Sequence, residues 1–248
     1  MKRREKHLIA SVLVGSLALC AAPSAYAMHI MEGYLPPSYC VLWGVLCAPV
    51  LAAGVLAIRR LTQENRRSML LLAMAGAFVF VISSLKIPSL SGSCSHMTGT
   101  GLSAILFGVP VTAILGLIVL IFQALLLGHG GITTLGANTF SMAVAGPMVS
   151  FLLYRVLGKC RVPTLVRVFL AASLGDLFTY CVTSFQLALA NPSANGGIAA
   201  SIVEFLGVFA PTQLPLACIE GILTMLIIMG METYAKPELR DIGFLQEV

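Results

Sequence analysis

Residues 38–60, SYCVLWGVLCAPVLAAGVLAIRR, decide the fold, because the uncharged run 38–58 ends in two arginines, Arg59 and Arg60. An α-helix needs about 20 apolar residues to cross the ~30 Å hydrocarbon core of a bilayer. Lys and Arg collect at the cytoplasmic ends of such spans. The stretch therefore predicts a transmembrane helix that ends in the cytoplasm.

The composition extends this prediction to the whole chain. Of its 248 residues 58% are hydrophobic and 10% are charged, and the mean hydropathy is +0.95, whereas soluble proteins carry about 25% charged residues. The net charge of +5 is spread over short clusters between apolar runs, which argues against nucleic-acid binding. We expect an all-α integral membrane protein with further apolar runs at 68–85, 102–127, 138–157, 165–190 and 211–233, and a shorter amphipathic piece at 198–208.

The first 27 residues have the three parts of a secretory signal peptide. Lys2, Arg3, Arg4 and Lys6 are basic, an apolar stretch runs over 8–20, and Ala25-Tyr26-Ala27 is an A-x-A cleavage site. The apolar stretch is short for a span, although an uncleaved first helix is the alternative. We expect residues 1–27 to be removed, leaving residues 28–248 as one membrane-embedded metal-binding domain.

The basic clusters predict the topology. They lie after the first run, around 155–167 and after the last run, so the positive-inside rule places all three in the cytoplasm. An even number of crossings must separate the first two clusters, so 102–127 supplies either none or two. Gly108 and Pro110 interrupt that run, which favours two short crossings broken at Pro110. The prediction is about seven transmembrane helices, N-terminus outside and C-terminus cytoplasmic.

This topology places two histidines on the outer side. The loop 86–101, KIPSLSGSCSHMTGTG, contains His96 and lies on the same side as Met28-His29. After cleavage, the Met28 amine, the His29 backbone nitrogen and its Nδ1 can chelate one ion, and His96 can supply a fourth nitrogen. Such a square suits Co²⁺, Ni²⁺ or Cu²⁺; the alternatives are a solvated His29 and a His96 that bonds to backbone.

Other polar residues have open roles. Glu32 caps the following turn or orients His29, Cys94 is a soft ligand or a neighbour of His96, and His129 is an extra ligand or orders its glycine-rich loop. Asn138 is expected to hold a loop backbone through its amide. Three further features have these interpretations. Lys86 reaches the membrane interface, and Ala73 and Ala77 form a face that docks a partner or packs within the subunit. Intramembrane carboxylates are functional candidates, but nothing in the sequence pairs Asp176, Glu204 and Glu220 into a proton relay, so we expect them to pack helices or interfaces.

Three stretches resemble one family: MHIMEGYLPP (28–37), LKIPSLSGSCSHMTGTGL (85–102) and FQALLLGHGGITTLGANTFSMAVAGP (122–147). They are similar to the cobalt substrate-specificity component of energy-coupling factor transporters, the CbiM type, which is related to the nickel NikM type. The resemblance implies a seven-span protein of the cell membrane that captures Co²⁺ on the extracytoplasmic side through Met28, His29 and His96. Met97 stands where we would expect proline after the histidine.

The resemblance also implies the role and the partners. The chain would be the non-catalytic substrate-binding subunit that supplies cobalt for cobalamin biosynthesis, without a prosthetic group. A transmembrane coupling protein of CbiQ type, a cytosolic ATPase of CbiO type and a small membrane protein of CbiN type would complete the transporter. The chain has no P-loop motif, so ATP hydrolysis would belong to the partners. The alternatives are Ni²⁺ as cargo, a polytopic metal-dependent membrane enzyme, and a permease that needs no partners.

Overall fold

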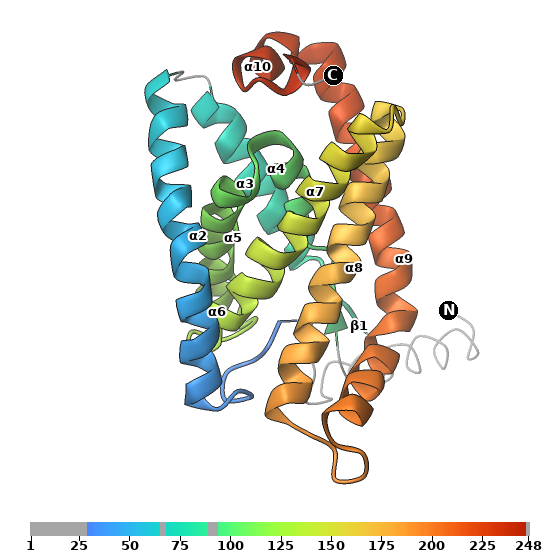
Figure 1. The fold of residues 1–248 in the computed structure, drawn as a ribbon. Coiled ribbons are helices and arrows are strands. Elements are labelled where there is room, and N and C mark those ends of the chain that lie inside the picture. The colour runs from blue at the N-terminus through green and yellow to red at the C-terminus, as the bar shows by residue number, and fades with distance from the viewer. Residues whose placement is uncertain (1–28, 65–67, 89–93, 247–248) are drawn as a thin grey trace, which may run out of the picture.

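The computed structural model describes residues 29–64, 68–88 and 94–246 and is almost entirely helical (Figure 1). An all-α fold was predicted and is confirmed, apart from one short antiparallel hairpin of β1 and β2. The elements in chain order are α2 (Pro37–Glu64), α3 (Ser68–Ser84), β1 (Ile87–Pro88), β2 (Cys94–Ser95), α4 (Thr100–Phe107), α5 (Val109–Leu127), α6 (Leu135–Asn138), the π-helix η2 (Thr139–Ala145), α7 (Gly146–Lys159), α8 (Thr164–Ala190), α9 (Gly197–Tyr234), α10 (Lys236–Asp241) and the 3₁₀-helix η3 (Phe244–Gln246). The predicted leader and Met28 lie outside the described residues.

Five helical segments of the described chain are long and apolar enough to cross a membrane. They are α2, α5, the continuous stretch from α6 to α7, α8 and α9. α3 is apolar but has only 17 residues, and α4 has only 8, which at 1.5 Å per residue is far too short to cross alone. The chain is therefore a multi-pass membrane protein, and its outward-facing apolar side chains, such as Val41, Val45 and Leu70, suit lipid.

Two details of the predicted helices are wrong. The run 102–127 does divide, but at Gly108 rather than at Pro110. Gly108 has φ 81° and Pro110 lies in the first turn of α5, where proline is tolerated because that N–H has no partner inside the helix. The separate piece predicted at 198–208 is part of α9, which continues through Pro211 and Pro215, since neighbouring helices can support a proline within a bundle.

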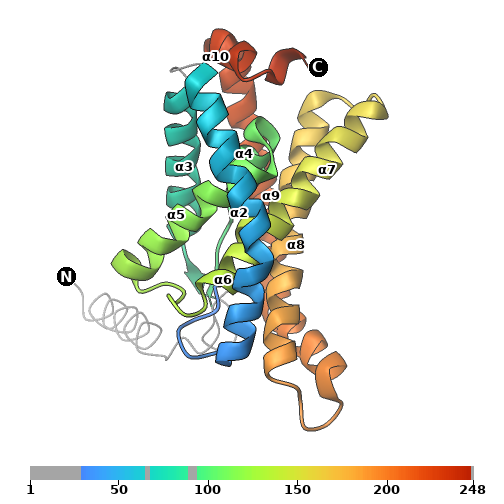
Figure 2. The same ribbon diagram turned by 60° about the vertical axis from the view of Figure 1, so that its left-hand side comes forward.

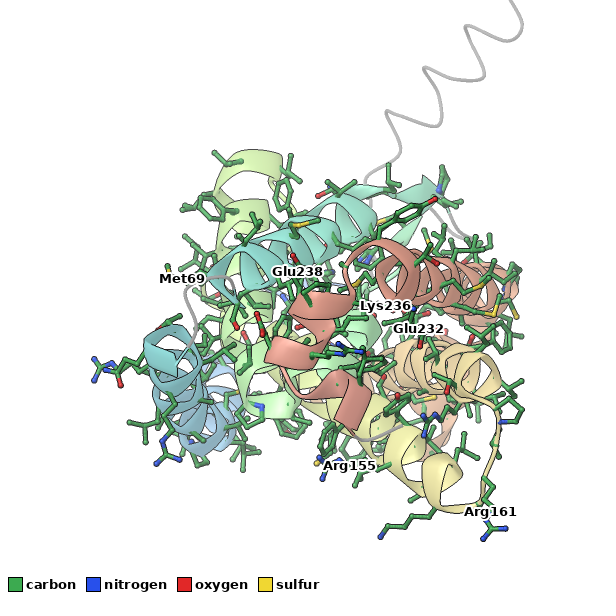
Figure 3. The ribbon with its side chains drawn as sticks, turned by 90° about the horizontal axis from the view of Figure 1, so that it is seen from above. Met69, Arg155, Arg161, Glu232, Lys236 and Glu238 are labelled. Carbon is green, nitrogen blue, oxygen red and sulfur yellow. The ribbon has the colours of Figure 1, made fainter. Side chains whose placement is uncertain are left out.

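The two ends of the bundle differ in charge. Figure 1 shows the C-terminal end of α2, the turn between α7 and α8, and α10 at one end of the molecule. Viewed from that end, Figure 3 shows Lys236, Glu232 and Glu238 near α10, and Arg155 and Arg161 on α7 and the turn that follows it. The members of the three predicted basic clusters that the structure describes thus share one end of the fold.

The opposite end carries the segments that contain the candidate ligands. The residues before α2 fold inward there, beside the connection between α5 and α6 (Figures 1 and 2). A hydrophobic cluster that includes Ile30, Leu35, Trp43, Leu187 and Phe209 supports this end. The N-terminal segment is thus part of the packed core.

The small-residue face of α3 points outward. Ala73 and Ala77 are exposed and line an open apolar groove, together with side chains of α2 and α5 such as Ile58 and Leu115. Of the two interpretations of this face, packing within the subunit is therefore wrong.

Candidate metal centre

The segment that follows Met28 is held inside the protein by the chain around Asn138. His29 and Ile30 are 3% and 1% exposed. The Asn138 side chain accepts a hydrogen bond from the Ile30 N–H at 2.8 Å and donates one to the Ile30 carbonyl at 3.0 Å. The Thr134 hydroxyl donates to the same carbonyl at 2.6 Å. The prediction that Asn138 holds a backbone near the site is confirmed, and the backbone is that of the N-terminal segment.

Glu32 makes a second connection between the same two segments. Its carboxylate accepts hydrogen bonds from the Thr133 hydroxyl at 2.5 Å and from the Thr133 N–H at 3.2 Å, and the hydroxyl bond lowers the pKa of Glu32. Both predicted roles of Glu32 are therefore wrong: it fixes the 131–134 loop instead of capping a turn or orienting His29. Gly131 permits this approach, because a Cβ there would lie 2.7 Å from the Glu32 nitrogen.

His96 follows β2 and is fully buried. Its Nδ1–H donates to the Met97 carbonyl oxygen at 2.8 Å, which leaves the lone pair of Nε2 free. Metal-binding histidines commonly use one ring nitrogen for a carbonyl in this way and the other for the ion. The substitution of Met97 for an expected proline leaves this bond intact, because it uses only the backbone carbonyl.

The free nitrogen of His96 faces His29. Nδ1 of His29 and Nε2 of His96 lie 2.5 Å apart, and the ring centroids are 4.4 Å apart. In the neutral state one proton lies between the two nitrogens, and a metal ion can take its place. The two predicted side-chain ligands, separated by 67 positions in the sequence, thus meet through the two atoms that the chelate requires.

His129 joins them, and its place in the cluster is a finding that the predicted ligand set lacked. It comes from the loop between α5 and α6, is 2% exposed, and has its ring 4.5 Å from that of His29 and 5.2 Å from that of His96. One nitrogen from each ring lies within 4.8 Å of the others. The sequence pointed to His129 in two ways: the predicted topology places it on the outer side, and it lies in a charge-free, glycine-rich loop.

The surroundings keep all three imidazoles neutral. Burial lowers the pKa of His29 well below 6.5, that of His96 to about 4 and that of His129 to about 2. Among the residues that the structure describes, neither Nε2 of His29 nor Nε2 of His129 has a hydrogen-bond partner. The cluster therefore presents uncharged nitrogen donors at neutral pH, which is the form that binds late first-row divalent ions.

A small, tightly packed polar pocket adjoins the cluster. It is lined by His29, His96, Asn138, Ser141, Met142, Thr179 and Thr183. Ser141 and Met142 belong to η2, a π-helical stretch, and such wider turns often occur at functional sites. The pocket is lined by hydroxyl groups and one amide besides the two imidazoles.

The remaining candidates lie outside this cluster. Cys94 is half-buried in β2 and does not belong to the histidine group. Lys86 and Glu204 are exposed. Asp176 and Glu220 are buried at 1% and 0% exposure between packed helices, as predicted, and they lie close enough to interact with each other, which the sequence did not predict.

Bundle and cluster together define a class: a multi-pass membrane protein with a buried cluster of three histidines, able to hold a metal ion, at the end opposite its described basic residues. The comparisons agree with this class. Residues 29–239 match the family described as "Cobalt uptake substrate-specific transmembrane region". The chain belongs to this family, the CbiM family.

Named relatives and solved structures support the assignment. The cobalt transport protein CbiM of Lachnoclostridium phytofermentans is 62% identical over 99% of this chain and 98% of that protein. CbiM of Chlorobium limicola is 59% identical over 87% and 85%. The crystal structure of a truncated transition metal transporter superposes with a TM-score of 0.71 and 27% identity, covering 83% of this chain and 99% of that one.

Proposed function

We propose that this protein is the substrate-binding subunit of an energy-coupling factor transporter and captures Co²⁺ on the outer face of the cell membrane. The observation that carries the proposal is the 2.5 Å separation of His29 Nδ1 and His96 Nε2. Nitrogen ligands bind such ions at about 2.0–2.1 Å, so one ion can reach both atoms. The named relatives are cobalt transport proteins, which favours Co²⁺ over Ni²⁺.

The full ligand set is the Met28 amine, the His29 backbone nitrogen, His29 Nδ1 and His96 Nε2. Removal of residues 1–27 as a signal peptide creates the amine, and residues 28–248 form the single metal-binding domain. The burial of His29 and Ile30, at 3% and 1% exposure, supports this, because it holds the His29 backbone inside the protein beside His96. The ring of His129 packs against that of His29, with centroids 4.5 Å apart, so His129 would support the His29 ring beside the bound ion.

The topology that fits is seven crossings with the metal centre outside. The five long helices and the shorter α3 would supply six of them. The seventh would combine the short α4 with the buried segment 95–99 that precedes it, since non-helical backbone is tolerated in a membrane where it is buried in protein. The gathering of Arg155, Arg161 and Lys236 at the end away from the histidines supports a cytoplasmic location for that end. The metal would then enter from the extracytoplasmic side.

Transport would require partner chains. A CbiQ-type coupling protein, a CbiO-type ATPase and a CbiN-type small membrane protein would complete the assembly, which would release Co²⁺ inward for cobalamin biosynthesis after the subunit reorients. The exposed Ala73–Ala77 face suits close approach of a partner helix. Deleting the ATPase should stop uptake, whereas a partner-free permease would continue.

An enzymatic role is disfavoured by the chemistry of the cluster. Its members are His29, His96 and His129, with no carboxylate among the described residues of that group to act as a general base. Four nitrogens around the ion would also leave no equatorial position for a reactive water. Capture and release of the ion fit this donor set better than hydrolysis.

The proposal is tested by moving the terminus. One alanine inserted between Ala27 and Met28, with cleavage at Ala27 verified by N-terminal sequencing, puts His29 in third place and separates the amine from the chelate. We expect calorimetry to show loss of high-affinity Co²⁺ binding by the purified mature subunit. The control is an alanine inserted before Ala25 that leaves the mature terminus unchanged. Equal affinity in both proteins would contradict the ligand set.

A further inference from the structure

Helix α9 contacts the loop that carries His96 through Gln213. The side chain is fully buried. Its Nε2 donates to the His96 carbonyl oxygen at 3.3 Å and to Asp176 Oδ2, on α8, at 2.5 Å. One amide group therefore connects the backbone of His96 to both α8 and α9.

Glu220, about two turns further along α9, contacts the same loop at Thr98, two residues after His96. Its Oε2 accepts a hydrogen bond from the Thr98 N–H at 2.6 Å, and its Oε1 accepts one from the Thr98 hydroxyl at 3.0 Å. The Gly99 N–H also donates to this carboxylate. These N–H groups precede α4, where no residue within the helix can accept their hydrogen bonds, so Glu220 serves as the cap from another helix.

Asp176 completes the network. Its carboxyl group accepts the Gln213 hydrogen bond at 2.5 Å and lies close enough to Glu220 for the two side chains to interact. Donors from Thr98 and Gln213 thus meet two buried carboxyl groups of neighbouring helices. Ionisable groups at this depth are costly and usually functional, and these lie directly behind the metal centre.

We propose that Gln213 and Glu220 are positioning residues for metal capture, which hold His96 so that its Nε2 faces His29 Nδ1. The inference rests on the proposed function, because it requires His96 to be a ligand. Neither side chain belongs to the histidine group, so each acts on the ion only through the 96–99 segment. If two residues act through the same contact, the effects of their substitutions on affinity do not add. A positioning residue should therefore lose its effect when His96 is removed, whereas a general loss of stability should persist.

The test is a double-mutant cycle with Co²⁺ as the probe. Gln213→Leu has a similar size and removes both donated hydrogen bonds; we expect the affinity for Co²⁺ to fall roughly tenfold and the visible absorption bands of bound Co²⁺ to shift. In a His96→Ala background the same substitution should leave the residual affinity unchanged. Glu220→Gln is the milder second variant, with an expected loss of about fivefold, and it completes the cycle if Gln213→Leu does not fold. The matched control is Thr224→Val on α9, whose buried hydroxyl has no partner.

Two results would overturn the inference. If Gln213→Leu and Glu220→Gln weaken binding equally with and without His96, their effect is general and not exerted through that ligand. If neither variant changes affinity or absorption while His96→Ala does, the proposed function stands and this inference alone fails. If His96→Ala itself binds like the wild type, the proposed ligand set fails as well.

Discussion

The hydrogen bonds between Asn138 and Ile30 give the sharpest test of how the site is built. Asn138→Ala removes both of them, at 2.8 and 3.0 Å. The Ile30 carbonyl keeps the hydrogen bond from the Thr134 hydroxyl, but the Ile30 N–H loses its acceptor, the Asn138 side-chain oxygen. Since Ile30 is 1% exposed, water cannot readily replace it.

The expected magnitude follows from that orphaned group. An unsatisfied buried donor costs about 1–3 kcal/mol, and 1.4 kcal/mol corresponds to a tenfold change in affinity. If the cost falls on the ordered N-terminal segment, Co²⁺ affinity should drop by roughly 5- to 150-fold. Asn138→Asp keeps the acceptor for the Ile30 N–H and loses the donor, so we expect an intermediate effect.

The assay is calorimetric titration of the detergent-purified mature subunit with Co²⁺. The control is Thr139→Val, the next residue, whose buried hydroxyl has no hydrogen-bond partner; its affinity should equal that of the wild type. An Asn138→Ala protein that is folded and binds Co²⁺ with wild-type affinity would refute the idea that the inserted segment needs this side chain.

Three further predictions concern the cluster and its loop. His129→Ala should weaken Co²⁺ binding roughly tenfold, which is less than the effect of His96→Ala, because the four proposed nitrogen ligands remain. If His129→Ala weakens binding as much as His96→Ala in the same titration, His129 is an equal ligand. Gly131→Ala should weaken binding about tenfold or more, because its Cβ would lie 2.7 Å from the Glu32 nitrogen, whereas Gly207→Ala, with open space around it, should not; equal affinities would contradict the close packing. Burial lowers the pKa of all three imidazoles, so these rings are already uncharged between pH 7 and 5. Only the Met28 amine, with a usual pKa near ~7.7–8.0, and the His29 backbone nitrogen should then release protons when Co²⁺ binds, about two per ion, and the affinity should fall as the pH falls. Calorimetry in buffers of different ionisation enthalpy counts these protons, and a count of four would show that protons compete with the ion at the imidazoles too.

Much of the fold could be predicted because lipid imposes a simple rule on sequence. The uncharged runs predicted most of the helices and their order along the chain. The arginine clusters predicted that the basic residues gather at one end of the bundle. Helix ends were harder, since Gly108 and Pro110 both break helices and only backbone geometry shows which one does. α9 was predicted to start near its prolines, yet packing supports a helix through Pro211 and Pro215.

The site was predictable to the extent that topology places residues on one side of a membrane. That argument found His29, His96 and the role of Asn138. It left His129 undecided, because side alone does not say which loops touch. The pairing of Asp176 with Glu220 was missed for a related reason: residues on α8 and α9 meet only when the rotation of both helices is known, and two apolar helices give no clear polar face.

X-ray absorption spectroscopy of the Co²⁺-loaded mature subunit tests the central claim most directly. We predict a first shell of nitrogen atoms only, with the outer-shell scattering of two imidazole rings from His29 and His96, and the loss of one ring signal in His96→Ala. A first shell dominated by oxygen or containing sulfur, or one unchanged in His96→Ala, would contradict the account.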